Sequence, residues 1–405
     1  MALTEIKENV FWVGAVDWDI RDFHGYSTEK GTTYNAYLVL DEKVALFDTV
    51  KYNFTEDLLY HIREVIDPEK IDYIVVNHVE MDHSGALPAI VELVKPEKII
   101  CSPMGHKALL DHFHRPDWPY EIVKSGDSIS LGKKTISFLE TRMLHWPDSM
   151  LSYIPEDKLL ISNDAFGQHL ASTERYADQV NECDLMPQAA KYYANILMLL
   201  SPLVQKTLAK VTELNLEIDM IAPDHGLIWR TNPVNPNSMG PGTILGLYDG
   251  WSKRQTIDKA LVIYDSMWES TAKMAKAIGS AIAREGVTVK MMNLQVNHRS
   301  DIMTEVLDSK ALVFGSATLN NGPLPRISDF LTYLKGLKPK GRVGAAFGSY
   351  GWSGEAVKVV SQALEAMEIE LVNPGLRVKY VPTEEHFDQC RELGKQIADA
   401  VKSKE

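Results

Sequence analysis

Three features are scarce in this sequence: cysteine, basic charge and long apolar runs. Its 405 residues include three cysteines, Cys101, Cys183 and Cys390, which are too few and too far apart for a disulfide framework or a metal cluster made of cysteine alone. No segment reaches the roughly 18 consecutive apolar residues that span a bilayer, and residues 1–10 lack the pattern of an export signal. We therefore expect a protein of the reducing cytoplasm with no membrane segment.

The charge balance is acidic, because 42 Lys and Arg stand against 55 Asp and Glu and leave a formal net charge of −13. A field of that sign repels nucleic-acid phosphates and anionic lipids, so neither a nucleic acid nor a membrane surface is an expected partner. The hydrophobic fraction of 45% is that of an ordinary globular protein and argues against a largely disordered chain.

The chain is longer than a single core usually is, and its pattern of elements changes part-way along. In the first part, strands are expected at residues 33–40, 43–48, 71–77, 98–101, 135–140 and 158–162, and helices at residues 56–66 and 189–214. Residues 231–242 concentrate Pro, Asn and Gly, which break both regular structures. We therefore place a boundary near residue 250 and predict two domains, residues 1–250 and residues 251–405.

After residue 250, strands and helices alternate strictly. Strands are expected at residues 260–264, 288–293, 311–315, 343–348 and 370–372, and helices at residues 271–285, 301–308, 326–334, 354–367 and 386–402. Apolar strands that each lead into a helix are typical of a doubly wound parallel sheet. The second domain is therefore predicted to be of this α/β type.

The most specific chemical pattern follows the predicted strand at residues 71–77. That strand is apolar on both faces, as in a buried sheet, and the sequence N-H-V-E-M-D-H-S-G overlaps its end. Alternation along the chain turns His78 and Glu80 to one side, while Asp82 and His83 lie where a helix would begin. A helix cap beside two solvated histidines is the alternative, but two imidazoles and two carboxylates after a buried strand favour metal binding.

Three further donors follow later strand-like runs. His145 stands in L-H-W-P-D-S, Asp164 in S-N-D-A-F-G and His225 in A-P-D-H-G. Because strand ends meet at one edge in layered α/β proteins, these side chains could join the first four. Each of them alone is as often structural, but together with the first cluster they predict one site of four histidines and three carboxylates.

The first cluster resembles the H-x-H-x-D-H motif of the metallo-β-lactamase fold, with Glu80 in place of the second histidine. A carboxylate at this position makes the site harder and more anionic, which suits iron and redox chemistry better than zinc and hydrolysis. The chain is similar in this respect to flavodiiron proteins, which share the substitution. The resemblance implies an αββα sandwich in which one iron is held by His78, Glu80 and His145, the other by Asp82, His83 and His225, and both by a bridging Asp164.

Three more positions, His24, His169 and Tyr193, match residues that line the site in that family. The resemblance implies that His24 donates to the oxygen species being reduced, that Tyr193 contacts it through its hydroxyl, and that His169 lies close by. Packing or surface hydrogen bonding is the alternative for each of the three.

The turn S-M-W-E-S-T, which follows the first strand of the second domain, favours a mononucleotide. Ser266, Ser270 and Thr271 supply hydroxyl donors, and the backbone amides at the start of the next helix point toward a bound phosphate. Neither the Gly-Lys-Ser of a Walker motif nor G-x-G-x-x-G occurs in this turn.

Two later loops, G-S-A-T-L-N-N and G-S-Y-G-W-S-G, resemble the flavin-ring loops of flavodoxins. Tyr350 and Trp352 offer ring faces for stacking, and Ala317 stands where the family usually has proline. An ordinary turn is the alternative for any one of the three loops. The residues expected to bind FMN are Ser266, Met267, Trp268, Glu269, Ser270, Thr271, Ser316, Ala317, Thr318, Leu319, Asn320, Asn321, Ser349, Tyr350, Gly351 and Trp352.

The resemblance covers both domains and implies an oxidoreductase that passes electrons from FMN to two iron ions, where dioxygen is reduced to water or nitric oxide to nitrous oxide. No C-x-x-C rubredoxin-like part follows the second domain, so we expect a separate donor, rubredoxin or another soluble carrier. Radii of gyration of ~18 and ~15 Å for the two domains would place the two sites of one extended chain too far apart for rapid electron transfer. The resemblance implies a head-to-tail homodimer, or a dimer of dimers, in which the FMN of one subunit lies beside the iron of the other. The competing hypotheses are a di-zinc hydrolase with a flavodoxin-like docking domain, and a pure electron carrier.

Overall fold

The structure is a computed structural model that describes residues 4–235 and 237–404. It divides into two compact units. The first contains Met1–His24, Thr28–Tyr192 and Pro202–Asp249, and the second contains Gly25–Ser27, Tyr193–Ser201 and Gly250–Glu405. Residues 1–3 and 405, at the ends of the predicted domains, and residue 236 in the predicted boundary loop lie outside the described residues.

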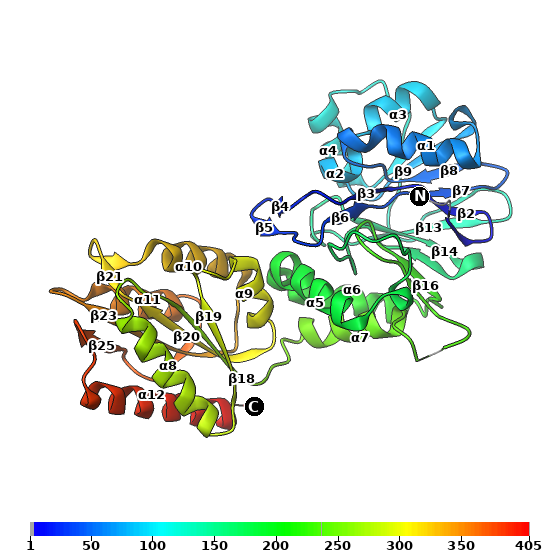
Figure 1. Cartoon of the computed structure of the whole chain (residues 1–405). Coiled ribbons are helices and arrows are strands. Elements are labelled where there is room, and N and C mark those ends of the chain that lie inside the picture. Colours follow the sequence, from blue (N-terminus) through cyan, green and yellow to red (C-terminus); the bar gives the residue numbers. More distant parts are fainter. Residues whose placement is uncertain (1–3, 236, 405) are drawn as a thin grey trace. The chain divides into compact units, whose positions relative to one another are not determined.

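The first unit is a sandwich of two sheets covered by helices (Figure 1). One sheet has the order β1-β2-β7-β8-β9-β10-β11 and the other the order β12-β13-β14-β15-β16-β17. Their strands are β1 (Thr4–Lys7), β2 (Val10–Trp12), β7 (Tyr37–Val39), β8 (Ala45–Phe47), β9 (Tyr73–Val76), β10 (Lys98–Cys101), β11 (Tyr120–Ile122), β12 (Ser128–Ser130), β13 (Thr135–Glu140), β14 (Met150–Ile154), β15 (Leu159–Ile161), β16 (Met220–Ala222) and β17 (Trp229–Arg230). The helices are α1 (Thr55–Val65), α2 (Met81–Ser84), α3 (Leu87–Val94) and α4 (Pro103–Phe113) on one side and α5 (Glu182–Tyr192), α6 (Ser201–Glu213) and α7 (Pro241–Ser252) on the other. This order of layers confirms the predicted αββα sandwich.

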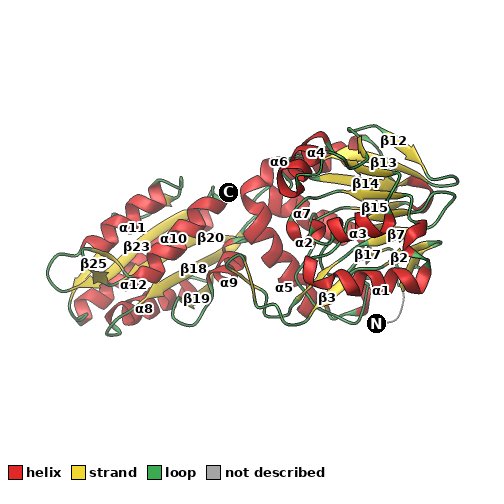
Figure 2. Cartoon of the chain, turned by 90° about the horizontal axis from the view of Figure 1, so that it is seen from above, coloured by secondary structure: helices red, strands yellow, loops and turns green. Residues whose placement is uncertain are grey.

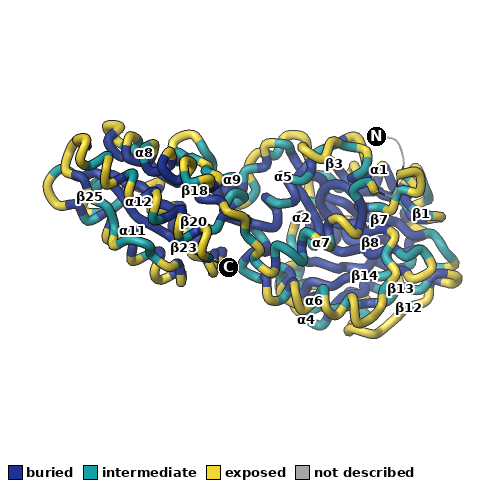
Figure 3. The backbone as a smooth tube through the Cα atoms, turned by 90° about the horizontal axis from the view of Figure 1, so that it is seen from below, coloured by how far each residue is buried: buried dark blue, intermediate teal, exposed yellow. Residues whose placement is uncertain are grey.

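The strand β9 shows why the first sheet is buried on both faces. Its residues Ile74 and Val76 pack with the core beneath α1 and α3, whereas Tyr73 and Val75 pack in the core between the two sheets. Side chains alternate along a strand, so a run that is apolar throughout fills two cores at once. Figure 3 shows the strands of this unit as a buried interior with exposed loops around it.

Two elements of this unit that were predicted to be continuous, one strand and one helix, are interrupted in the structure. Residues 33–40 form two strands, β6 (Thr32–Tyr34), which pairs with β3 (Ala15–Asp17), and β7 in the large sheet. The buried amide of Asn35 lies between them and donates to the Pro223 carbonyl at 2.7 Å, which turns the chain away from a continuous ladder.

Residues 189–214 form α5, a π-helical turn η5 (Tyr193–Leu197), a 3-10 turn η6 (Met198–Leu200) and α6. Pro202 lacks the N–H that a continuous helix would need there.

The second unit is built on a parallel sheet of the order β19-β18-β20-β23-β24, with β25 also paired to β23 (Figure 2). Its strands are β18 (Ile257–Asp265), β19 (Thr288–Asn293), β20 (Ser309–Ser316), β23 (Val343–Tyr350), β24 (Glu370–Leu371) and β25 (Leu376–Lys379). Its helices are α8 (Ser270–Arg284), α9 (Arg299–Val306), α10 (Pro325–Leu337), α11 (Glu355–Glu365) and α12 (Glu384–Ser403). Met274 and Ile278 of α8 pack with Leu393 and Ile397 of α12 in the core over one face of the sheet. This confirms the predicted doubly wound sheet.

The predicted strict alternation in the second unit was wrong in two places. A hairpin of β21 (Thr318–Leu319) and β22 (Gly322–Pro323) lies within the second loop, because Asn320 and Asn321 adopt positive φ angles of 49° and 62° and turn the chain. Strand β25 follows β24 without an intervening helix, and Gly375, at φ 109°, lies in the turn between them. Among the described residues, no helix combines the length and apolar character needed to cross a bilayer.

Candidate metal centre and flavin loops

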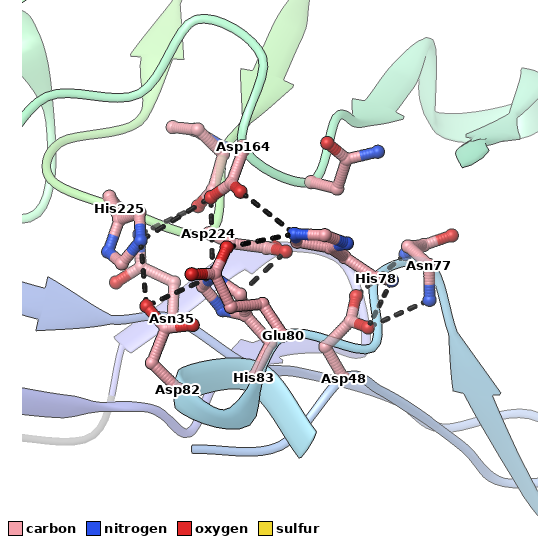
Figure 4. Close-up of polar contacts among 12 residues, drawn as sticks. Asn35, Asp48, Asn77, His78, Glu80, Asp82, His83, Asp164, Asp224 and His225 are labelled. Carbon is pink, nitrogen blue, oxygen red and sulfur yellow. Dashed lines mark hydrogen bonds and ion pairs between the residues drawn. The ribbon is translucent and has the colours of Figure 1, made fainter. Parts of the chain in front are cut away.

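The seven predicted metal donors converge at one end of the sandwich in the first unit. Figure 4 labels all of them except His145. His78 and Glu80 lie in the segment after β9, and Asp82 and His83 lie on the short helix α2 that follows it. The other three come from loops after later strands: His145 after β13, Asp164 after β15 and His225 after β16. Strands β15 and β16 run parallel, so Asp164 and His225 leave the sheet at the same edge.

The first group consists of His78, Glu80, His145 and Asp164, whose donor atoms all lie within 4.8 Å of one another. The Nε2 atom of His78 is 3.3 Å from both Glu80 Oε2 and Asp164 Oδ2. The Nε2 atom of His145 is 3.2 Å from the same glutamate oxygen and 2.9 Å from the same aspartate oxygen. Two imidazoles and two carboxylates thus face a common point, as the ligands of one cation do.

The second group consists of Asp82, His83 and His225, which are all buried. Asp82 Oδ2 lies 3.4 Å from His83 Nε2 and 3.2 Å from His225 Nε2. The other oxygen of Asp164, Oδ1, lies 3.2 and 3.4 Å from the same two nitrogens. Asp164 therefore directs Oδ2 to the first group and Oδ1 to the second, so that two neighbouring cations would share this carboxylate.

The protonation of the two groups is strongly coupled. Burial lowers the pKa of His83, but Asp82 and Asp164 outweigh it and raise the pKa to about 9. Burial likewise opposes a charged His78, yet Asp148, Asp164 and Glu80 raise its pKa well above the usual value. Burial alone would raise the pKa of Glu80 and of Asp82, but the neighbouring histidines hold each at about 2. The carboxylates are therefore ionised at neutral pH, whereas the imidazoles retain protons that a metal would have to replace.

Several polar atoms of the centre are buried without a hydrogen-bond partner among the described residues. They include both carboxylate oxygens of Asp82, both ring nitrogens of His83 and Oδ1 of Asp164. Burying such atoms unpaired costs free energy, and coordination to a cation would satisfy them. The donor set, oxygen and nitrogen without sulfur, fits iron.

The three predicted flavin loops all follow the carboxyl ends of neighbouring parallel strands of the second unit, namely β18, β20 and β23. The first and third loops are joined by a hydrogen bond of 2.9 Å between the hydroxyls of Thr271 and Ser349. The rings of Trp268 and Trp352 are 85% and 86% exposed, which is unusual for tryptophan and leaves two apolar faces for a planar ligand to cover. Helix α8 begins at Ser270, directly after the first loop, and its amino-terminal amides could bind a phosphate there.

Comparisons with known proteins agree with both sites. The family model for the ODP family beta lactamase matches residues 32–226, and that for flavodoxin matches residues 262–394. The chain is 48% identical to a nitric oxide reductase of Moorella thermoacetica, over 98% of each chain, and 45% identical to the rubredoxin-oxygen oxidoreductase of Megalodesulfovibrio gigas, over 100% of this chain and 99% of the other. The solved structure of rubredoxin oxygen:oxidoreductase from the anaerobe Desulfovibrio gigas has a TM-score of 0.96 at 45% identity and covers 100% of this chain and 99% of that chain.

The chain belongs to the flavodiiron protein family. It is therefore a flavodiiron oxidoreductase, and the family's cofactors, FMN and a di-iron centre, agree with the flavodoxin match and with the donor clusters. This membership favours the oxidoreductase over the di-zinc hydrolase and over a pure electron carrier.

The three residues predicted to line the iron centre of this flavodiiron protein lie in different surroundings. His24 is largely exposed, and its Nε2 atom is 3.9 Å from Glu80 Oε1. His169 is buried beside His225, with ring centroids 4.8 Å apart, and its Nδ1 atom is 2.7 Å from the hydroxyl of Thr32. Burial and the neighbouring His225 lower the pKa of His169 well below its usual value, so it is a neutral imidazole at neutral pH.

Tyr193 belongs to the second unit, where its hydroxyl forms a 3.1 Å hydrogen bond with Ser201 and its ring contacts Trp251. Within the first unit, two tyrosines lie beside His225: the ring of Tyr34 is 6.0 Å and that of Tyr192 is 6.1 Å from its ring, and Tyr192 is also 5.1 Å from His169. Burial, followed by the charge of Asp164, raises the pKa of Tyr192 well above 10. Tyr192 was not considered in the sequence analysis, although it directly precedes Tyr193 in the sequence; the role predicted for Tyr193 stays a prediction.

Two other neighbours of the sites were missed. Asp148 is buried behind His78, and its place in the sequence, three residues after His145, was the available signal. A fourth loop, which begins at Tyr380 after β25, reaches the third flavin loop, because the Tyr380 amide donates to the Tyr350 carbonyl at 2.7 Å. Tyr380 is 60% exposed there, beside Gly351.

Proposed function

We propose that this flavodiiron protein accepts electrons from rubredoxin or a similar soluble carrier and reduces dioxygen to water or nitric oxide to nitrous oxide. Its named relatives include a nitric oxide reductase and a rubredoxin-oxygen oxidoreductase, so both gases are substrates to test. Reduction of one dioxygen consumes four electrons and four protons, and reduction of two nitric oxide molecules to one nitrous oxide consumes two of each. We further propose that it works in the cytoplasm, where its three free cysteines would stay reduced.

The observation that carries this proposal is the arrangement of Asp164 between the two donor groups. We assign His78, Glu80 and His145 to one iron, Asp82, His83 and His225 to the other, and the two oxygens of Asp164 to both. Two ferrous ions and a reduced flavin would supply the electrons for reduction of the gas. Glu80 adds a third carboxylate to this centre, which neutralises more of the cationic charge than a histidine would and favours iron over zinc.

The flavin would be held by the three loops at the carboxyl end of the parallel sheet. The hydroxyls of Ser266 and Thr271 and the amides of α8 would bind its phosphate, and the exposed Trp268 and Trp352 would cover its ring. We include the fourth loop at Tyr380 in this site, because it is hydrogen-bonded to the third loop.

We also propose the head-to-tail homodimer. Apolar side chains are exposed near each site: Tyr52, Met81 and Met143 near the metal donors, and Trp268 and Trp352 on the flavin loops. Surfaces of this kind are usually covered by a partner, and a two-fold axis would cover both pairs at once. A strictly monomeric enzyme with full turnover would exclude the dimer.

The test of the proposed function is consumption of dioxygen and of nitric oxide by the reduced, iron-loaded protein with rubredoxin as donor. Glu80→Ala and His145→Ala should abolish both activities and leave FMN bound, since their sites lie in the first unit. The control Glu69→Ala removes an exposed glutamate of the same unit and should leave turnover unchanged. Retained gas consumption in either ligand variant, or a purified protein that binds zinc and takes up no iron, would contradict the assignment.

A further inference from the structure

The buried carboxylate of Asp148 lies directly behind one of the metal-site histidines. Its Oδ2 atom accepts a hydrogen bond of 2.9 Å from His78 Nδ1 and another of 2.7 Å from the backbone amide of Val79. Asp148 is 2% exposed and His78 is fully buried, so solvent does not compete for this contact. The Nδ1 atom of His78 therefore keeps its proton when a metal binds, and Nε2, on the side of Glu80 and Asp164, is the atom that would bind the metal.

The histidines of the second group have weaker support behind them. His225 donates from Nδ1 to the uncharged backbone carbonyl of Thr33 at 2.7 Å. His83 Nδ1 is 3.8 Å from Asp224 Oδ2, beyond hydrogen-bonding distance. Neither of these two imidazoles thus donates from its Nδ1 atom to a carboxylate among the described residues, in contrast to His78.

We propose that Asp148 is a positioning residue that makes the two metal positions unequal. The proposal rests on the proposed function, because it concerns how the di-iron centre is held. An anionic partner fixes the tautomer and the orientation of its imidazole and makes the free nitrogen a stronger donor than a carbonyl partner does. The ion bound by His78, Glu80 and His145 is therefore held more tightly than the ion bound by Asp82, His83 and His225, and its ferric form is favoured.

The surroundings of Asp148 provide a matched control. The hydroxyl of Ser102 donates to the backbone carbonyl of Asp148 at 2.8 Å and accepts from the Gly105 amide at the start of α4. Ser102→Ala thus disturbs the same loop and removes a helix cap without touching the Asp148 carboxylate. If Asp148 only holds the loop in place, Ser102→Ala should lower the iron affinity as the Asp148 variants do. If Asp148 acts through His78, Ser102→Ala should leave the iron affinity unchanged.

The experiment is an anaerobic titration of the full-length protein with ferrous iron against a competing chelator, for wild type, Asp148→Asn, Asp148→Ala and Ser102→Ala. Asp148→Ala should weaken binding of one of the two ions by roughly 10- to 100-fold and leave the other within a few-fold. Asp148→Asn keeps an acceptor but removes the charge, so it should give a smaller loss. Mössbauer spectra of the loaded protein should show a change in one of two iron signals in both variants and none in Ser102→Ala.

Equal weakening of both ions, no weakening in Asp148→Ala, or the same loss in Ser102→Ala would overturn the role of Asp148. Thermal unfolding of each metal-free variant shows whether a loss of iron merely follows a loss of folding, which would also count against it. The proposed function fails separately, and this inference with it, if the wild-type protein binds fewer than two iron ions per chain.

Discussion

The affinity of the centre for ferrous iron should rise steeply between about pH 6 and pH 8, where unperturbed carboxylates and lysines do not titrate. The carboxylates do not contribute to this rise, because Glu80 and Asp82, with pKa values of about 2, are already ionised. The histidines do contribute, because their folded pKa values lie above 6.5 and each must lose a proton before its Nε2 atom can bind a metal. The sign follows directly: protons compete with iron, so a lower pH weakens binding.

The magnitude follows from the number of protonated histidines in each donor group. In the first group His78 has a pKa well above its usual value, and in the second His83 has a pKa of about 9, so each ion displaces at least one proton at neutral pH. The pKa values of His145 and His225 are also raised, so the binding of each ion can release a second proton. The affinity for each ion should therefore increase between about 10- and 100-fold per pH unit, or about 1.4 to 2.7 kcal/mol.

Chelator competition at three pH values measures this slope, and calorimetry in two buffers of different ionisation enthalpy counts the released protons independently. The flavin absorbance serves as an internal control, since the second unit should remain unchanged. An iron affinity that is independent of pH, or titration without proton release, would refute the assignment of protonated histidines as the ligands.

Three further outcomes are expected. The raised pKa of His83 should stabilise the metal-free protein by on the order of 3 kcal/mol. This stabilisation is complete below the pKa of an unfolded histidine, near 6.5, and should be lost as the pH rises through about 9. Thermal melts should show the loss in the metal-free protein and not in the iron-loaded protein. Gly226→Ala should reduce the iron content and the melting temperature, because the glycine has φ 79° and a Cβ atom there would collide with Gln168; a variant with normal iron content would contradict this. Arg342→Met should destabilise the second unit by about 2 to 4 kcal/mol in denaturant melts, because the buried guanidinium donates to three backbone carbonyls that would lose their partner; a cost below about 0.5 kcal/mol would refute this role.

The convergence of the seven predicted donors could be foreseen because their positions depend mainly on strand ends. His78, Glu80, Asp82 and His83 are local in sequence, so one strand end and one helix start suffice to bring them together. His145, Asp164 and His225 required only that the ends of β13, β15 and β16 share an edge, which is a general property of layered α/β folds.

The support behind the donors could not be predicted in the same way. Asp148 is one acid among 55 acidic residues, and its role depends on the path of the loop between β13 and β14, which sets its distance to His78. The position of the fourth loop depends on β25, a strand of four residues. Strand β25 pairs with the carboxyl-terminal half of β23, whereas β24 pairs with its amino-terminal half. A short strand whose pairing is decided by a distant partner has little periodicity of its own to detect.

The break in the helix between Tyr192 and Tyr193 shows the same limit at the scale of one residue. Helical periodicity in residues 189–214 predicts a continuous helix. It does not show at which residue the helix changes to the π-helical turn η5. The change falls between the two tyrosines: Tyr192 ends α5 with its ring beside His169, and Tyr193 begins η5 with its hydroxyl on Ser201. Neighbouring residues on a helix point about 100° apart, so the side chains of Tyr192 and Tyr193 enter different surroundings, and the contact predicted for Tyr193 stays a prediction. Burial, followed by the charge of Asp164, raises the pKa of Tyr192 well above its usual value, so its hydroxyl keeps its proton at neutral pH, a consequence of where α5 ends that the periodicity of the sequence does not contain.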